Sequence, residues 1–427
     1  MSPDLRWRWV AVLGVAGLVL SACGGDDDEK AATEPKASGS ATSEAPAGAK
    51  GDGTLKIGTL LPQTGSLAFL GPPMFGGTDL AAKDINDAGG VLGQQVEVVD
   101  SDSGDTATDT ASQSVDRLLS NEVDAIIGAA SSSVSLSVID KITGDGVVQV
   151  SPANTSDELT NYDDKGLYFR TAPPDVLQGR VLGDLILSDG NTTLGIMALQ
   201  DSYGTGLAES VTNSFTGGGG EVVETVVYDP KAASFSTEVG QIKAADPEAI
   251  ALIAFDETKK IIPELVQQSI GPDTKKIYFV DGNLAGYTED FPKGTLVGVK
   301  GTLPGVAAQD DFKARLLEVD PELTEFAYSP ESYDATILVA LAAQAAGDDS
   351  GESIASAMQD VSAGGEKCTS YADCLAMLEE DADIDYDGIS GPVEFNEQGD
   401  PSQASIGIYE YQPDNDYTFV EAKEGQI

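Results

Sequence analysis

The chain has 427 residues, 41% of them hydrophobic, so it is long enough to form two domains with ordinary cores. Lysine and arginine number 24 against 71 aspartates and glutamates, and the resulting net charge of −47 argues against nucleic acids and anionic lipid surfaces as partners. There is no histidine, no Gly-x-Ser-x-Gly elbow and no Gly-Lys phosphate loop, so a serine hydrolase or a nucleoside triphosphatase is disfavoured. The enzyme class that stays as an alternative is one that works without histidine.

A basic and apolar leader opens the chain. Arg6 and Arg8 precede the apolar run Val10–Leu20, which is too short to span a bilayer. The next residues complete Leu-Ser-Ala-Cys, which resembles a bacterial lipoprotein box and implies cleavage after residues 1–22 and lipidation of the Cys23 thiol. An ordinary signal peptide cut near Ala22 is the alternative. Either way we expect export, and the lipoprotein interpretation predicts a lipid anchor on the outer face of the cell membrane.

Residues 23–53 follow as a segment of Asp, Glu, Ala, Ser, Thr, Pro and Gly with almost no large apolar side chain. Such a composition cannot bury a core, so we predict a disordered linker that holds the folded part away from the membrane.

Strands and helices alternate from Thr54 onward. The first set of predicted strands is LKIGTLL after Thr54, Val96–Asp100, Asp124–Ile127 and Val147–Val150, and the second set is Thr193–Leu199, Glu221–Tyr228, Ala249–Phe255 and Lys276–Val280. Helical patterns separate the strands in both sets. Alternation of this kind predicts two successive α/β lobes, each with a mostly parallel sheet. The C-terminal third is predicted to contain helices at Asp311–Glu318 and Tyr333–Ala346, a loop-rich region, and a strand pair at Ser405–Tyr411 and Tyr417–Val420.

Two predicted strands end in clusters of hydroxyl side chains. Ser131, Ser132 and Ser133 come after the strand that ends at Ile127, and the loop Ser151–Thr155 comes after the strand that ends at Val150. Open α/β sheets hold ligands at the carboxyl ends of their strands, so the two loops predict a binding cleft. Plain helix capping by these hydroxyls is the alternative.

Three cysteines are present: Cys23 in the leader, and Cys368 and Cys374 in CTSYADC. In an exported protein we expect the last two to form a disulfide that closes a small loop and contributes about 2 kcal/mol, with free thiols as the alternative.

One acidic segment matches the spacing of a calcium-binding loop. It runs from Asp383 to Glu394, with glycine at the sixth position. Ser390 takes the eighth place, where a small apolar residue is usual, Pro392 follows, and flanking helices are not evident. We therefore favour a solvated acidic loop and predict neither a metal nor a cofactor.

Several motifs resemble a known family. PQTGSLAFLG, AAKDINDAGGVLG, IIGAASSSVS, VSPANTSDELT, LYFRTAPPD, DSYGTGLAES and SGPVEFNEQGD are similar to the solute-binding lipoproteins of ABC importers, in particular the branched-chain amino-acid (Leu/Ile/Val) branch with the type I periplasmic-binding fold. The resemblance implies two Rossmann-like lobes joined by three hinge crossovers. It places lobe one at residues 54–173 plus 302–390 and lobe two at residues 174–301 plus 391–427.

The resemblance also implies how lobe one holds a ligand. Ser132, or Ser131 after a one-residue slip, would offer a hydroxyl and main-chain N–H groups to the ligand α-carboxylate. The carbonyl of Ala153 would accept from the α-ammonium, and Thr155 would contact both groups.

In lobe two, the resemblance implies that Tyr203 covers the ligand and that Asp281 pairs with the ammonium. A core tyrosine and a turn-capping aspartate are the alternatives. The sequence departs from the family pattern at Leu70, where an aromatic is usual, and at Asp281, which replaces a glutamate. Phe255 and its neighbour Asp256 stand near another expected aromatic, so either an apolar or an acidic side chain is expected to line the cleft there.

The leading functional hypothesis is therefore a lipid-anchored, monomeric receptor that captures an amino acid, or a related amide or carboxylate, and delivers it to ABC permease subunits without chemistry. The alternative is an exported sensory module of the same fold that is not tied to transport.

Overall fold

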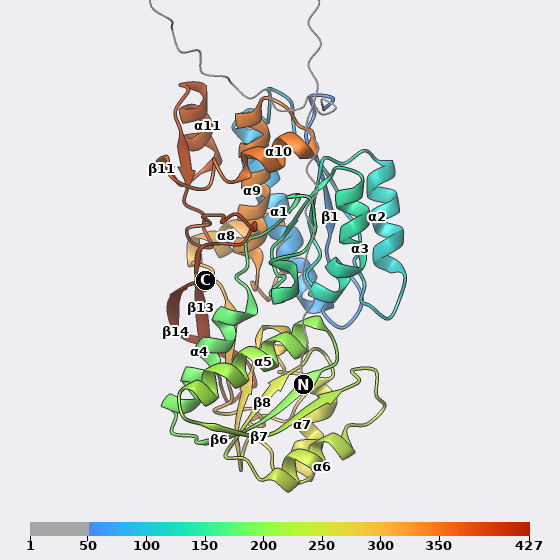
Figure 1. The fold of residues 1–427 in the computed structure, drawn as a ribbon, viewed down its shortest axis with the longest axis vertical. Helices are drawn as coiled ribbons and strands as arrows, with labels where there is room; N and C mark the ends of the chain where they lie inside the picture. Colours follow the sequence, from blue (N-terminus) through green and yellow to red (C-terminus); the bar gives the residue numbers. More distant parts are fainter. Residues whose placement is uncertain (1–50) are drawn as a thin grey trace, which may run out of the picture. The chain divides into compact units, whose positions relative to one another are not determined.

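The computed structural model describes residues 51–427, which contain two open α/β sheets and one two-stranded sheet (Figure 1). The predicted signal peptide, Cys23 and most of the predicted linker lie outside the described residues. None of the helices found in residues 51–427 combines the length and the apolar character needed to cross a bilayer.

The first sheet has five strands, and every neighbouring pair in it is parallel. In spatial order its strands are β2 (Glu97–Val99), β1 (Lys56–Leu60), β3 (Ala125–Gly128), β4 (Val148–Ser151) and β5 (Tyr168–Arg170). The helices that follow the first strands are α1 (Gly71–Asp87), α2 (Thr110–Ser120) and α3 (Ser132–Gly144).

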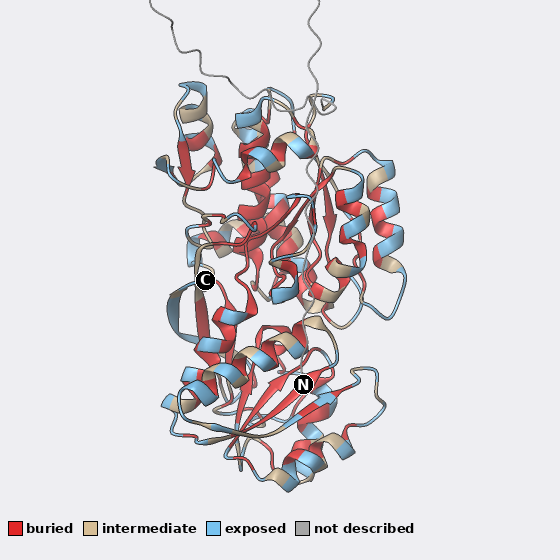
Figure 2. Cartoon of the chain, in the orientation of Figure 1, coloured by how far each residue is buried: buried red, intermediate tan, exposed pale blue. Residues whose placement is uncertain are grey.

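Strand β3 is the middle strand of this sheet, and its apolar sequence is explained by burial on both faces. Ala125 and Ile127 pack in one apolar cluster with residues of α1 and of the later helix α9 (Ser329–Ala346), whereas Ile126 packs in another with α2 and α3. Successive side chains of a strand point to opposite faces, so a strand covered on both faces needs a continuous apolar run. Ala125, Ile126 and Ile127 are all buried, and Figure 2 shows α9 buried along most of its length.

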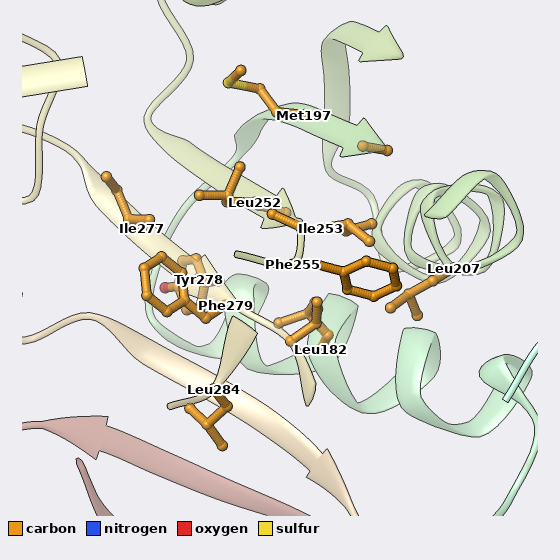
Figure 3. Packing of buried hydrophobic residues seen from close by; sticks show 14 of the residues in the cluster. Leu182, Met197, Leu207, Leu252, Ile253, Phe255, Ile277, Tyr278, Phe279 and Leu284 are labelled. Atoms are coloured by element: carbon orange, nitrogen blue, oxygen red, sulfur yellow. The ribbon is translucent and has the colours of Figure 1, made fainter. Parts of the chain in front are cut away.

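The second sheet has seven strands. In spatial order they are β14 (Tyr417–Gln426), β13 (Gln403–Tyr411), β10 (Lys300–Pro304), β9 (Lys276–Phe279), β8 (Ala249–Ile253), β6 (Thr193–Leu199) and β7 (Glu221–Tyr228). Its helices are α4 (Asp175–Ser188), α5 (Ser202–Gly217), α6 (Ser236–Ala245) and α7 (Thr258–Gln267). Figure 3 shows apolar side chains of β8 and β9 packed with those of α4 and α5, among them Leu252, Phe279, Leu182 and Leu207.

Each sheet with its helices forms one Rossmann-like lobe, and the chain passes between the two sheets three times. The crossings lie between β5 and α4, after β10, and between the small strand β12 (Ile384–Tyr386) and β13. The predicted lobe boundary between residues 301 and 302 lies within β10, because Lys300–Pro304 all pair with β13. Gly301 and Pro304 obscure this strand in the sequence, since both residue types are uncommon inside strands.

The C-terminal third is more regular than the sequence predicted. The region expected to be loop-rich contains α10 (Gly351–Met358), β11 (Glu366–Cys368), α11 (Tyr371–Glu379) and β12, and α8 (Asp310–Val319) precedes α9. Strands β11 and β12 have only three residues each, which is too short for a periodic signal. The predicted final strand pair is confirmed as the antiparallel strands β13 and β14.

The predicted disulfide between Cys368 and Cys374 is present, with Cα atoms 5.3 Å apart, and it joins β11 to α11. Both residues lie in the apolar cluster that also contains α9. Replacing both cysteines with serine is expected to lower the free energy of unfolding by about 2 kcal/mol, the chain-entropy value for a loop this short. Urea unfolding of oxidised protein measures the change; an unchanged free energy of unfolding contradicts the prediction.

Candidate ligand-binding site

A small cavity lies at the carboxyl ends of strands from both sheets. All eight residues predicted to bind ligand line it: Leu70, Ser131, Ser132, Ala153, Thr155, Tyr203, Phe255 and Asp281. Leu67, Ala130, Gly282 and Tyr328 complete the lining. The strand ends of an open α/β sheet are where such folds hold ligands, and here two sheets contribute to one cavity.

The cavity volume is about 20 Å³, close to the space that one water molecule needs. An amino acid is several times larger than a water molecule, so the two lobes must separate before a ligand of that size enters. A direct contact between the lobes is present beside the cavity: the Ser133 Oγ atom lies 3.2 Å from Asp201 Oδ2 and 3.0 Å from Ser202 Oγ.

The serine loop after β3 has two different roles. Ser131 is the N-cap of α3, and its hydroxyl accepts a hydrogen bond from the Val134 N–H at 3.4 Å, which is the helix capping that the sequence left open as the alternative. The Ser132 hydroxyl oxygen accepts from the N–H groups of Thr155 and Ser156 at 3.3 and 3.2 Å. Because a serine hydroxyl has two lone pairs and one proton, Ser132 retains its proton for donation into the cavity.

Buried hydrogen bonds hold the second loop in place. The Asn154 side-chain amide donates to the carbonyls of Ala129 and Ala130 at 3.0 and 2.9 Å, and the Ser151 hydroxyl donates to the Ala129 carbonyl at 2.7 Å. These two polar residues of the hydroxyl-rich loop therefore fix the backbone, whereas Ala153 and Thr155 line the cavity.

A buried ion pair fixes the far end of the same loop. Arg170 Nε lies 2.6 Å from Asp400 Oδ1, and the two side chains are 0% and 1% exposed. The guanidinium also donates to the carbonyls of Asn154 and Ser156 at 3.3 and 2.9 Å, and to the Thr160 hydroxyl at 2.6 Å. The ion pair thereby connects the cavity loop to the third crossover.

Asp281 lies across the cavity from these loops and is 5% exposed. Its Oδ1 atom accepts from the Tyr203 hydroxyl at 2.6 Å and from Gln178 Nε2 at 3.0 Å, and its Oδ2 atom accepts from the Tyr328 hydroxyl at 2.8 Å. Within residues 51–427, all of these side-chain partners are neutral. Burial raises the pKa of the Asp281 carboxyl, although the three hydrogen bonds act in the opposite direction.

Apolar side chains cover the remaining wall. The rings of Tyr203 and Phe255 are stacked, with centroids 5.5 Å apart and an interplanar angle of 10°. Phe255 rather than Asp256 lines the cavity, because Asp256 is exposed and its carboxylate lies 2.9 Å from Lys259 Nζ. Leu67 and Leu70 lie on the first-lobe side.

Two side chains that donate to Asp281 carried no recognisable signal in the sequence. Tyr328 precedes α9 in the left-handed conformation, with φ of 60°, and lies 47 positions from its partner Asp281. Gln178 lies on α4, 103 positions from Asp281. Only the tertiary fold brings these partners together, so no local pattern could have identified them.

The segment tested for a calcium loop is not a solvated loop, because it contains strand β12 and is paired with a lysine. Lys367 Nζ lies 2.9 Å from both Asp385 Oδ2 and Asp387 Oδ1, and 3.6 Å from Glu394 Oε1. One ammonium group therefore lies among three of the carboxylates that the spacing pointed to.

A larger cavity of about 350 Å³ lies at the three crossovers, with Thr171, Gly305, Glu331 and Pro392 among its lining residues. The smaller cavity differs from it in its chemistry, because opposite groups converge there from two sheets: hydroxyl groups on one side and a buried carboxylate on the other.

Comparison with known proteins agrees with this geometry. A family model described as "Periplasmic binding protein" matches residues 54–367, which is more than half of the chain. The chain belongs to this periplasmic binding protein family. Members are solute-binding proteins and not enzymes, and the family implies an extracytoplasmic location.

Proteins similar to this chain differ in the ligands with which they were solved. The chain is 26% identical over 371 residues to the chemotactic signal transduction system substrate-binding protein BasB of Halobacterium salinarum, covering 81% of this chain and 84% of that protein. Two solved structures share its type I fold. One is the branched-chain amino acid transporter substrate binding protein LivJ from Streptococcus pneumoniae in complex with isoleucine (21% identity, 88% of this chain and 100% of that chain, TM-score 0.70). The other is an ABC transporter solute binding protein from R. palustris in complex with benzoate (18% identity, 88% and 98%, TM-score 0.70).

Proposed function

We propose that this periplasmic binding protein captures an amino acid, with a branched-chain or other small apolar side chain, in the cavity between its lobes and delivers it to ABC permease subunits. The observation that carries the proposal is Asp281, a buried carboxylate held by three neutral donors in a cavity that the hydroxyl residues Ser131, Ser132 and Thr155 also line. A ligand with an ammonium group at one end and a carboxylate at the other complements both walls.

The ammonium end of the proposed ligand would lie at Asp281. Burying a carboxylate without a cation costs several kcal/mol, whereas a charge-assisted hydrogen bond to a cation offsets part of that cost. The carbonyl of Ala153 and the hydroxyl of Thr155 provide further acceptors on the opposite wall.

The carboxylate end of the ligand would lie at the start of α3. Ser131 and Ser132 line the cavity there, and the N-terminus of a 13-residue helix favours negative charge. The Ser132 proton, which its neighbours leave available, would add a charge-assisted hydrogen bond of about 1.5–3 kcal/mol.

The apolar wall favours an apolar ligand side chain. Leu67, Leu70 and Phe255 provide contact surface without a further charged group. Rotation about the three crossovers would open the cavity for entry and close it over the ligand, the motion typical of this class of protein. Lipidation at Cys23 and the linker of residues 23–53 would keep the receptor near its permease, and we expect it to act as a monomer.

The similarity to BasB favours one second candidate, in which ligand binding is reported to a sensory partner rather than to a permease. The cavity chemistry is the same in both cases. Pull-down of solubilised membranes with ligand-loaded protein separates the two: recovery of permease subunits supports transport, and recovery of a chemotaxis transducer in their place contradicts it.

The proposal predicts which ligands stabilise the protein. In a thermal unfolding assay, at least one apolar amino acid is expected to raise the melting temperature, with a stabilisation of about 2.7 kcal/mol at a hundredfold excess over its dissociation constant. For leucine, the matched controls are 4-methylpentanoate, which lacks the amine, and 3-methylbutylamine, which lacks the carboxylate; both should stabilise far less. If none of the twenty amino acids shifts the melting temperature, the amino-acid proposal is wrong.

A further inference from the structure

The larger cavity, which we call the hinge cavity, is bordered by all three crossovers between the lobes. Its volume of about 350 Å³ is sufficient for a small organic molecule. Thr171 and Pro173 come from the first crossover and Gly305 from the second. The third crossover contributes Ser390, Gly391, Pro392, Val393 and Pro401. A molecule in this cavity would therefore contact every segment about which the lobes rotate.

Glu331, in the first turn of α9, brings a buried carboxyl group to the wall of the hinge cavity. The residue is 2% exposed, and its Oε1 atom has no hydrogen-bond partner. Oε1 lies against Gly305, in the space that a side chain at that position would fill. Burial, followed by the negative charge of Asp334, raises the pKa of the Glu331 carboxyl well above its ordinary value, although its own main-chain N–H acts in the opposite direction. The group therefore lacks a cationic partner.

A second acid on the same helix shows what a structural carboxylate looks like here. Asp334 lies three positions after Glu331 and accepts from the Tyr386 hydroxyl at 2.7 Å and from the N–H groups of Ile389 and Ser390 at 3.0 and 2.7 Å. These bonds attach the third crossover to α9. Glu331 makes no comparable contact within residues 51–427, so holding the crossovers together does not explain a buried acid at its position.

The hydroxyl groups of the hinge cavity can act only as acceptors towards a ligand. The Thr171 hydroxyl donates to the Glu331 carbonyl at 2.9 Å, and the Ser390 hydroxyl donates to an Asp334 carboxylate oxygen. Because a hydroxyl group has one proton, both oxygens then have only lone pairs to offer. A complementary ligand must therefore supply several hydrogen-bond donors.

The charge of the wall favours a cation. Glu424 is a second acid at the exposed side of the hinge cavity, and within residues 51–427 no lysine or arginine is among the lining residues. Arg180 lies near β14 but donates to the Gln426 carbonyl at 2.9 Å and does not line the cavity. A separate cavity of about 340 Å³ also borders Glu331, but Lys313 is part of its lining. Only the hinge cavity of these two combines Glu331 with an excess of negative charge.

We propose that the hinge cavity is a second ligand site, in which Glu331 binds a small guanidinium compound and the bound compound favours the closed arrangement of the lobes. A guanidinium group offers five N–H donors in one plane, which suits a carboxylate surrounded by further acceptors. It is weakly hydrated, and its flat faces can lie on apolar surface. Pro173, Pro392 and Pro401 provide such surface.

The expected coupling to the amino-acid site rests on the proposed function. The hinge cavity has this shape while the lobes touch through Ser133 and Asp201, so a ligand that fits it stabilises that arrangement. The same arrangement encloses a ligand at Asp281. Each ligand should therefore raise the affinity for the other by the same factor.

Isothermal titration calorimetry of the full chain with butylguanidine and butylurea tests the site itself. Butylurea has nearly the same shape but no charge, so wild-type protein should bind butylguanidine at least about tenfold more tightly. Glu331→Gln should lose this preference. Glu318→Gln, at an exposed position of α8, removes the same charge and should behave as wild type. Ala404→Met retains Glu331 but fills part of the hinge cavity, and it should weaken binding of both probes.

A second titration tests the coupling. The amino acid with the largest thermal shift is titrated with and without saturating butylguanidine. Its affinity should rise about fivefold in wild-type protein and should not change in Glu331→Gln.

The outcomes separate this inference from the proposed function. Equal affinities of wild-type protein for butylguanidine and butylurea contradict the second site, even if the variants do not fold. A loss of amino-acid affinity in the presence of butylguanidine also contradicts it, because the two would then compete for the Asp281 cavity. An unchanged amino-acid affinity contradicts the coupling. If no amino acid binds, the proposed function is wrong, and the direct titration with butylguanidine still decides whether the hinge cavity is a site.

Discussion

Replacing Asp281 with asparagine is expected to weaken binding of an amino-acid ligand about a hundredfold, because it removes the carboxylate partner of a buried ammonium group. Asparagine has nearly the same shape; its amide oxygen can accept from the Tyr203 hydroxyl, and its NH2 group can donate to the Tyr328 hydroxyl oxygen, so the fold should persist. Isothermal titration calorimetry measures the change.

The chain offers a matched control in Asp256, which follows the cavity residue Phe255 but is exposed and paired with Lys259 at 2.9 Å. Asp256→Asn removes the same charge and is expected to leave the affinity unchanged. Equal losses in both variants would mean that the general negative charge of the protein, rather than a specific contact, attracts the ligand.

The direction of the pH effect follows from the raised pKa of the Asp281 carboxyl. Amine binding requires the ionised carboxylate, so affinity should fall as the pH falls through that pKa, and the loss should begin at a higher pH than for an ordinary aspartate. The ligand-free protein should show the opposite trend. Its folded state holds the proton more tightly than the unfolded chain, so this carboxyl destabilises the fold increasingly as the pH rises from about 4 towards the raised pKa. Asp281→Asn should remove both effects.

Replacing Arg170 with methionine is expected to lower the free energy of unfolding by about 3–5 kcal/mol, because it leaves Asp400 buried without its cation. The change also removes the hydrogen bonds to the Asn154 and Ser156 carbonyls, so the loop that carries Thr155 should lose its position and ligand affinity should fall. Urea unfolding and calorimetry measure the two effects.

A double variant tests whether the loss of stability comes from the unpaired Asp400 carboxylate. Arg170→Met with Asp400→Leu replaces the whole pair by apolar groups and should recover part of the stability lost in Arg170→Met alone. Simple addition of two losses would contradict the account. Lys83→Met, which breaks an exposed pair with Asp87, is the control and should leave the stability unchanged.

The parts of the fold that could be predicted from sequence are those with strong local patterns. β3 and β8 are continuous apolar runs followed by helices, which is sufficient to predict buried parallel strands. β10 could not be predicted in this way, because its position between β9 and β13 depends on tertiary pairing and its residues include Gly301 and Pro304.

The residues of the candidate site also differ in whether the sequence could identify them. Its loops follow strands that the sequence identifies, and the resemblance supplied Tyr203 and Asp281, all of which the fold brings to one cavity. Tyr328 and Gln178 contact Asp281 from remote positions in the chain, and no pattern of spacing encodes such contacts. In the loop Ser151–Thr155, the resemblance named Thr155, which lines the cavity, but nothing in the sequence indicated that Asn154 fixes the loop.

A crystal structure of the protein bound to the amino acid that stabilises it most would test the central claim most directly. The account predicts that the ligand nitrogen lies about 2.7–3.2 Å from an Asp281 carboxylate oxygen and that the ligand carboxylate lies at the same distance from the Ser132 hydroxyl. A ligand bound outside this cavity, or one that presents its carboxylate to Asp281, would contradict it.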